Sequence, residues 1–108
     1  MTEPQVFPAT SDDAITEIVL MADYGACTWD QTGAAMWIGE VGGSETLEQR
    51  IDDWERHYWL RLDEPEKFDP IYLDAEGRLI AHEIKALVGN SIRVTHRSFN
   101  HDLFVIDG

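Results

Sequence analysis

The chain has 108 residues and a formal net charge of −13 at pH 7, from 21 Asp and Glu residues against 8 Lys and Arg residues. This charge disfavours binding to nucleic-acid phosphates or to anionic membranes, because both need clustered basic side chains. The length fits one domain, and a hydrophobic share of 44% predicts a folded core instead of an acidic disordered tail.

Residues 1–14 contain two prolines and little hydrophobic periodicity, and we interpret them as an N-terminal arm before a single domain over 15–108. The chain begins without a basic region or a long apolar stretch, so no signal peptide is expected. Cys27 is the only cysteine, which excludes an internal disulfide. Together these features predict a soluble, cytoplasmic protein.

The next segment predicts three strands. Residues 15–22 are apolar at both odd and even positions, which is typical of a central strand buried on both faces. A turn at Gly33 separates residues 27–30 from residues 35–38 and predicts a short hairpin. A glycine-rich stretch then separates this hairpin from the first helix.

A first helix is expected over residues 44–62. Ser44 is a good N-cap, and Glu45 and Glu48 lie in the first turn, where the helix dipole favours acidic side chains. Spacings of three and four residues place a set of apolar side chains on one face. These are Leu47, Ile51, Trp54, Tyr58 and Leu62.

A second helix is expected over residues 70–88. Asp69 followed by proline is typical of an N-cap and the first helical residue, and Asp74 is an alternative N-cap. Gly77 lies on the apolar face of this helix, where glycine costs about 1 kcal/mol relative to alanine. We therefore expect a close approach at Gly77 by a neighbouring backbone or by the ring of Trp54.

The last two strands are expected over residues 92–97, which alternate between apolar and polar, and over residues 103–106. Strands at both ends of the chain enclose two helices. This order predicts an α+β fold with two layers, in which a small, mostly antiparallel sheet packs against the helices.

No catalytic or metal-binding set emerges from the sequence. The four histidines have no helical pair spacing and Cys27 has no second cysteine, so neither a metal site nor a cofactor is expected. Acidic neighbours raise the pKa of a thiol, so Cys27 is expected to be a buried, inert side chain. No nucleophile, base and orienting group occur together, and the prediction is that the chain is not an enzyme.

Two interpretations of the tryptophans stay open. Trp29 and Trp37 flank the predicted Gly33 turn, and each can pack beneath the hairpin or anchor a protein interface. Trp59 lies off the apolar stripe of the first helix and is a candidate anchor. Whether these three side chains are buried cannot be derived from the spacing alone.

Three segments together resemble a group of small, acidic, mostly uncharacterised bacterial proteins. They are Ala22-Asp23-Tyr24-Gly25 with Trp29 four residues on, the helix from Leu47 to Tyr58, and Glu76-Gly77-Arg78 at the opening of the second helix. Some proteins of that group look like toxin-immunity proteins. The resemblance covers residues 18–95, and residues 98–108 are additional to it.

The resemblance implies no catalytic residue. It implies structural roles for Asp23, Tyr24, Gly25 and Trp29 in the turn after the first strand, and for the triplet at 76–78. The Ala26-Cys27-Thr28 approach to the tryptophan departs from the group's more apolar pattern.

The charge is distributed unevenly. Residues 1–49 contain nine acidic residues and no Lys or Arg, and residues 45–76 contain eleven acidic and four basic residues. We therefore hypothesise a protein that neutralises a basic partner, most specifically a cognate nuclease-like toxin domain, with no nucleic-acid or membrane partner. The expected contact residues are Glu48, Asp52, Asp53, Glu55 and Trp59. The alternatives are a small ligand-binding or enzymatic domain with the Tyr24–Trp37 hairpin as a pocket wall, and a housekeeping protein whose acidity serves solubility.

Overall fold

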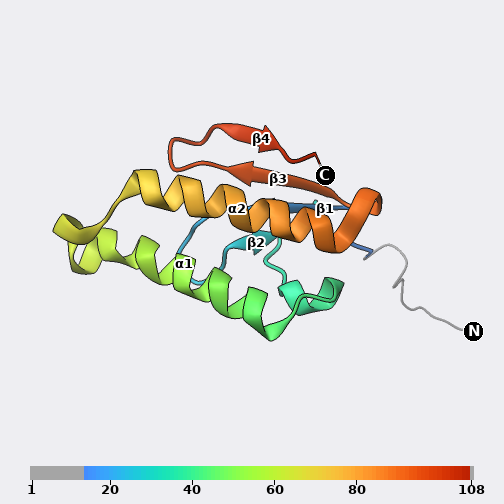
Figure 1. Cartoon of the computed structure of the whole chain (residues 1–108), viewed down its shortest axis with the longest axis horizontal. Coiled ribbons are helices and arrows are strands. Elements are labelled where there is room, and N and C mark those ends of the chain that lie inside the picture. The colour runs from blue at the N-terminus through green and yellow to red at the C-terminus, as the bar shows by residue number, and fades with distance from the viewer. Residues whose placement is uncertain (1–13, 108) are drawn as a thin grey trace, which may run out of the picture.

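The computed structural model describes residues 14–107, so the expected N-terminal arm lies almost entirely outside the described residues. Two helices lie on one side of a four-stranded sheet (Figure 1), and the expected α+β class is confirmed. In chain order the strands and α-helices are β1 (Glu17–Leu20), β2 (Thr28–Trp29), α1 (Glu45–Asp63), α2 (Pro70–Val88), β3 (Arg93–Arg97) and β4 (Leu103–Val105).

The sheet has the order β2-β1-β3-β4 and is mixed. Its outer pairs, β1 with β2 and β3 with β4, are antiparallel, as expected for most of the sheet. The central pair is parallel, with Leu20 opposite His96. The helices α1 and α2 lie between β2 and β3 in the chain, and they return the polypeptide to the end of the sheet where β1 begins.

Two of the strand predictions were wrong in detail. In β1 only Ile18 and Leu20 are fully buried, while Glu17 and Val19 are partly exposed, because both helices cover the same face of the sheet. The expected strand at 35–38 is reduced to a single bridge between Ala35 and Trp29. The chain then turns into a 3₁₀ helix, η3 (Ile38–Val41).

The helix α1 begins as predicted at Ser44, whose hydroxyl oxygen accepts a hydrogen bond from the Leu47 amide at 3.1 Å. Leu47, Ile51 and Trp54 are buried, but Leu62 is 62% exposed. The apolar face therefore ends earlier than its spacing indicated. The reason is that the last turn of α1 extends beyond the sheet (Figure 1).

The N-cap of α2 is Asp69, whose carboxylate accepts hydrogen bonds from two amides of the first turn. Gly77 is buried, and a Cβ there would lie 2.7 Å from the ring of Trp54 and 2.7 Å from Nε2 of His96. The expected close approach of Trp54 is confirmed, and His96 is a second neighbour that the sequence did not indicate.

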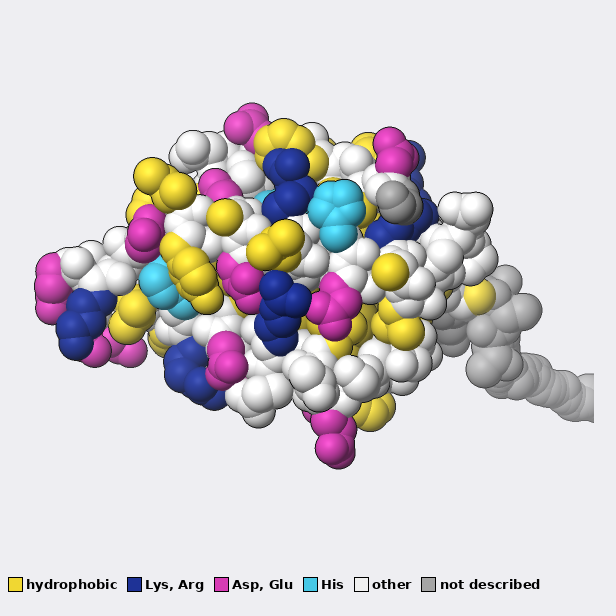
Figure 2. All heavy atoms as spheres, viewed as in Figure 1, with side chains coloured by type: hydrophobic (Ala, Val, Ile, Leu, Met, Phe, Trp, Pro, Cys, Tyr) yellow, Lys and Arg dark blue, Asp and Glu magenta, His cyan; other side chains and the backbone are white. Residues whose placement is uncertain are grey.

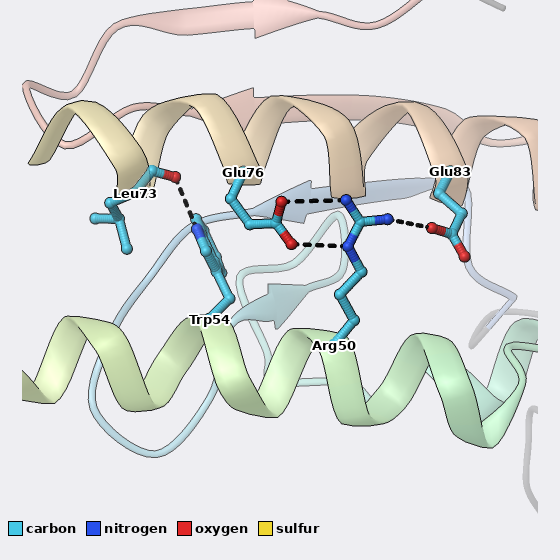
Figure 3. Close-up of polar contacts among 5 residues, drawn as sticks. All are labelled: Arg50, Trp54, Leu73, Glu76 and Glu83. Atoms are coloured by element: carbon cyan, nitrogen blue, oxygen red, sulfur yellow. Dashed lines mark hydrogen bonds and ion pairs between the residues drawn. The ribbon is translucent and has the colours of Figure 1, made fainter. Parts of the chain in front are cut away.

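The seam between α1 and α2 pairs its polar groups (Figure 3). The indole N–H of Trp54 donates to the Leu73 carbonyl at 2.7 Å. Arg50 binds both carboxylate oxygens of Glu76, at 2.7 and 3.1 Å, and one oxygen of Glu83 at 2.6 Å. Acidic and basic side chains are interspersed on this face of the molecule (Figure 2), so its charges are largely balanced locally.

Candidate functional site

A cavity of about 410 Å³ lies beside α1, on a different side from the seam with α2. One wall is the segment from Gly25 to Glu40, and the other wall is α1. We call this cavity the acidic groove. It is lined by residues 25–28, 35–38 and 40 and, from α1, by Glu48, Ile51, Asp52 and Glu55.

The α1 wall carries three carboxylates at positions i, i+4 and i+7, a spacing that places Glu48, Asp52 and Glu55 on one stripe of the helix. Within residues 14–107, no hydrogen bond or ion pair engages the carboxylates of Glu48 and Asp52. Asp52 is exposed and Glu48 is partly exposed. These two side chains therefore keep their full capacity to accept hydrogen bonds from another molecule.

Glu55 is engaged within the chain. Its Oε2 accepts hydrogen bonds from the amide of Gly25 at 2.9 Å and from the indole N–H of Trp59 at 3.1 Å. Gly25 has φ of +98°, a left-handed conformation that favours glycine. Glu55 thus fixes the turn after β1 against α1, and its role is structural as well as electrostatic.

Trp59 is 38% exposed, and its ring centroid lies 4.6 Å from that of Tyr24. The hydroxyl of Tyr24 in turn accepts a hydrogen bond from Arg61 at 3.1 Å. Trp59 therefore presents one part of its surface to solvent while the rest supports the turn. An aromatic side chain that is already fixed loses little conformational freedom on binding, as an interface anchor requires.

The opposite wall contributes an exposed aromatic side chain and a fourth carboxylate. Trp37 is 59% exposed, and its ring packs so closely on Gly39 that a Cβ there would lie 2.4 Å from it. Glu40 accepts a hydrogen bond from the Trp37 amide at 2.8 Å. Trp29 differs from Trp37, because it is only partly exposed and its indole N–H donates to the Met21 carbonyl at 3.2 Å.

Apolar side chains form the floor of the groove. Cys27, Met36, Ile38 and Ile51 line it and are all buried. Burial raises the pKa of the Cys27 thiol to about 12, and the neighbouring carboxylate of Glu55 adds to this effect. The thiol is therefore protonated at neutral pH, as the acidic sequence context predicted.

The groove lacks a cation of its own. None of the described residues that line it is Lys or Arg, while four of them are Asp or Glu. The wall from Gly25 to Glu40 belongs to the first 49 residues, which contain no Lys or Arg at all. Any cation that balances Glu48 and Asp52 must consequently come from a more distant part of the chain or from another molecule.

The structure brings together four of the five predicted contact residues, since Trp59 continues the stripe of Glu48, Asp52 and Glu55. Asp53 lies on a different stripe, where it accepts hydrogen bonds from Gln49 at 3.0 Å and from Arg56 at 2.8 Å. The sequence did not indicate Glu40 as a groove residue. The only feature of the sequence that pointed to Glu40 was its place in the half of the chain without Lys or Arg.

The described residues contain no group of three or more His, Cys, Asp or Glu side chains placed to hold a metal ion. No helix in the described part of the chain is long and apolar enough to cross a membrane. Comparisons with protein-family models, curated proteins and solved structures find no match for this chain. The resemblance to toxin-immunity proteins therefore stays a prediction.

Proposed function

We propose that this chain is a binding protein that docks its acidic groove onto a basic surface of another protein. The observation that carries the proposal is the pair of unengaged carboxylates on α1, Glu48 and Asp52, facing a wall that has no basic residue. A partner's Lys or Arg side chains would supply the missing counter-charge. The exposed rings of Trp37 and Trp59 would supply apolar contact area next to it.

The electrostatic field of the chain supports the same partner class. A net charge of −13 attracts a basic protein at long range and can raise its association rate by roughly 10- to 10³-fold at low salt. Short-range contacts at the groove would then fix the orientation. This combination of fast association and local charge complementarity is characteristic of inhibitors that must reach their target quickly.

The most specific form of the proposal is a cytoplasmic immunity protein that occludes a nuclease-like toxin domain. The active site of such a toxin is basic because it binds phosphates. An acidic protein that covers this site excludes the nucleic acid without any catalytic group of its own. The small size, the acidity and the resemblance in the turn after β1 support this form.

The direct test uses the purified product of the adjacent upstream gene as the partner. Titration calorimetry and stopped-flow association would be measured across a salt series. We expect stoichiometric binding whose association rate falls steeply with salt. The E48Q/D52N double variant should associate about tenfold more slowly, because two of the unbalanced charges are removed.

The matched comparison is D52N with D53N, because each removes one acidic charge, and Asp53 lies on the stripe of α1 that already contacts Arg56. D53N should change association much less than D52N does. Binding that is absent, or that is insensitive to salt, would contradict the electrostatic proposal. For the toxin form, one equivalent of this protein should also suppress the nuclease activity of the partner.

A further inference from the structure

A second cavity, separate from the acidic groove, lies at the carboxyl ends of the two central strands. It has a volume of about 240 Å³. Its walls come from the segments that follow β1 and β3 and from the facing sides of α1 and α2. Four parts of the chain that are distant in sequence therefore meet around it.

The position of this cavity follows from the topology of the sheet. β1 and β3 are parallel neighbours, and the chain leaves them in opposite directions, from β1 to β2 and from β3 to β4. The cavity lies where these two connections diverge, beyond the carboxyl ends of β1 and β3.

Acidic side chains on two sides of the cavity have unused hydrogen-bonding capacity. Asp23 accepts the amide of Tyr24 at 2.8 Å, and Asp74 accepts the amide of Phe99 at 2.8 Å, each through Oδ1. Within residues 14–107, no hydrogen bond engages the second carboxylate oxygen of either residue. Both oxygens are free to accept a bond from an ammonium group.

Basic side chains belong to the wall as well. Arg97 and His101 both line the cavity, and no described residue forms an ion pair or a side-chain hydrogen bond with either of them. His101 lies in the turn between β3 and β4, where its amide donates to the Ser98 carbonyl at 2.9 Å, and its φ of 71° is a left-handed conformation that histidine adopts more often than most residues.

The remaining wall is apolar and rigid. Trp54 is 2% exposed and is fixed by its hydrogen bond to the Leu73 carbonyl. The rings of Tyr58 and Phe99 both pack against the Arg61 guanidinium, whose carbon lies 4.9 and 5.2 Å from their centroids. The cavity thus combines apolar surface with a small number of groups of both charges, as small-molecule sites do.

We propose that this cavity binds a small zwitterion, an α-amino acid with an apolar side chain. Its ammonium group would contact Asp23 and Asp74, its carboxylate would contact Arg97 or His101, and its side chain would pack against Trp54. This site is independent of the acidic groove and of the protein partner proposed for it.

The charges favour a zwitterion over simpler ions. Two carboxylates and the guanidinium of Arg97 line the cavity, so a ligand with one charge of each sign meets an opposite charge at each end. The net charge of −13 repels a plain carboxylate, whereas a zwitterion carries no net charge and is not repelled. A plain amine would leave Arg97 and His101 without a partner.

Three matched probes test the ligand class by NMR titration of the intact protein. L-leucine carries both charged groups, 3-methylbutylamine lacks the carboxylate, and 4-methylpentanoate lacks the ammonium. We expect saturable shifts for residues around the cavity with L-leucine, with a Kd of about 1 mM or tighter. Each of the other probes should bind about tenfold more weakly, because one charge-assisted contact is lost.

The D74N and R97Q variants test the two ends of the ligand. Asn at position 74 keeps an oxygen for the Phe99 amide, so D74N should fold and yet bind L-leucine about tenfold more weakly. R97Q should weaken L-leucine and leave 3-methylbutylamine unchanged. R56Q, on the exposed surface of α1, is the control and should change nothing.

Any of three results would overturn the proposal. The first is the absence of saturable shifts with L-leucine in the native protein. The second is binding of L-leucine no tighter than that of 3-methylbutylamine, and the third is binding of L-leucine that D74N leaves unchanged. None of these results bears on the acidic groove, whose test uses a protein partner and different variants.

Discussion

The two long sides of α1 differ in whether their charged side chains have partners. On the side of α2, Arg50 binds Glu76 and Glu83, and Trp54 donates to the Leu73 carbonyl. On the side of the groove, the carboxylates of Glu48 and Asp52 have no partner among the described residues, and the facing wall adds Glu40. One helix therefore carries a seam with paired charges and a groove with unpaired ones.

This difference indicates that one side of α1 contributes to the stability of the fold and the other side is available for binding. Loss of Arg50 would leave the partly buried carboxylate of Glu76 without its partner, which costs stability, whereas the neighbouring like charges of the groove destabilise the fold slightly. The seam is thus the part of α1 that holds the fold, and the groove is the part that is free to meet another molecule.

The largest effect is expected from the core beneath the seam, at His96. This side chain is 1% exposed, and its two ring nitrogens have no hydrogen-bond partner within residues 14–107. Burial lowers the pKa of His96 from 6.5 to about 4, and the nearby charge of Arg78 adds to this while Asp74 opposes it. Folding therefore holds the imidazole neutral.

The sign of the pH dependence follows from this shift. In the unfolded chain His96 binds a proton below pH 6.5, whereas in the folded chain it binds one only below about pH 4. The free energy of unfolding therefore falls as the pH falls from 6.5 to 4. The loss from this residue is about 3 kcal/mol by pH 4. Urea unfolding of the native protein and of H96L at pH 7, 6, 5 and 4 measures it. If both proteins lost stability in parallel, the loss would belong to other groups.

The second effect concerns Gly77, where the seam meets β3. Alanine is the better helix former by about 1 kcal/mol, but its Cβ would lie 2.7 Å from both His96 and Trp54. We expect G77A to destabilise the protein by about 2 kcal/mol, because overpacking outweighs propensity. The comparison variant is A75G on the exposed face of α2, which should cost about 1 kcal/mol. Stabilisation by G77A in denaturant unfolding would show that the close approach is absent.

These two positions illustrate how much the sequence could predict. The caps at Ser44 and Asp69, the span of α2 and the approach of Trp54 to Gly77 followed from local patterns, because helix ends and faces depend on nearby residues. His96 was not predicted as a neighbour of Gly77. Its position depends on the parallel pairing of β1 with β3, which no local spacing encodes.

In the candidate site, too, some features could be predicted from the sequence and others could not. The stripe of Glu48, Asp52 and Glu55 could be derived from helical spacing, and so could the density of acidic residues. The separation of Asp53 from this stripe was missed, because the facing element decides which side of a helix is a groove. The contribution of Trp37 depends on residues 35–38 forming a bridge and η3 instead of a strand.

The third effect tests the seam directly. R50Q removes the cation between Glu76 and Glu83, and Glu76 has a side chain only 18% exposed. We expect a loss of about 1–2 kcal/mol, reduced from the value for a buried pair because Arg50 is one-third exposed. R56Q, which breaks the exposed pair with Asp53, should cost less than about 0.5 kcal/mol. Equal losses for the two variants would mean that the seam is not a special stabilising feature.

The smallest effect on stability is expected in the groove, and its sign matters more than its size. Asp52 lies four residues from Glu48, a like charge, so D52N should stabilise the isolated protein by about 0.3 kcal/mol at low salt, while Glu48 keeps its favourable place in the first turn of α1. The gain should disappear at high salt, because exposed charges are screened. D53N is the matched control and should be neutral or slightly destabilising, since it loses the contact with Arg56. A loss of about 1 kcal/mol or more in D52N would show that a cation of the same chain already engages this carboxylate. The groove would then be a second paired seam, and the reason to assign it to an external partner would be gone.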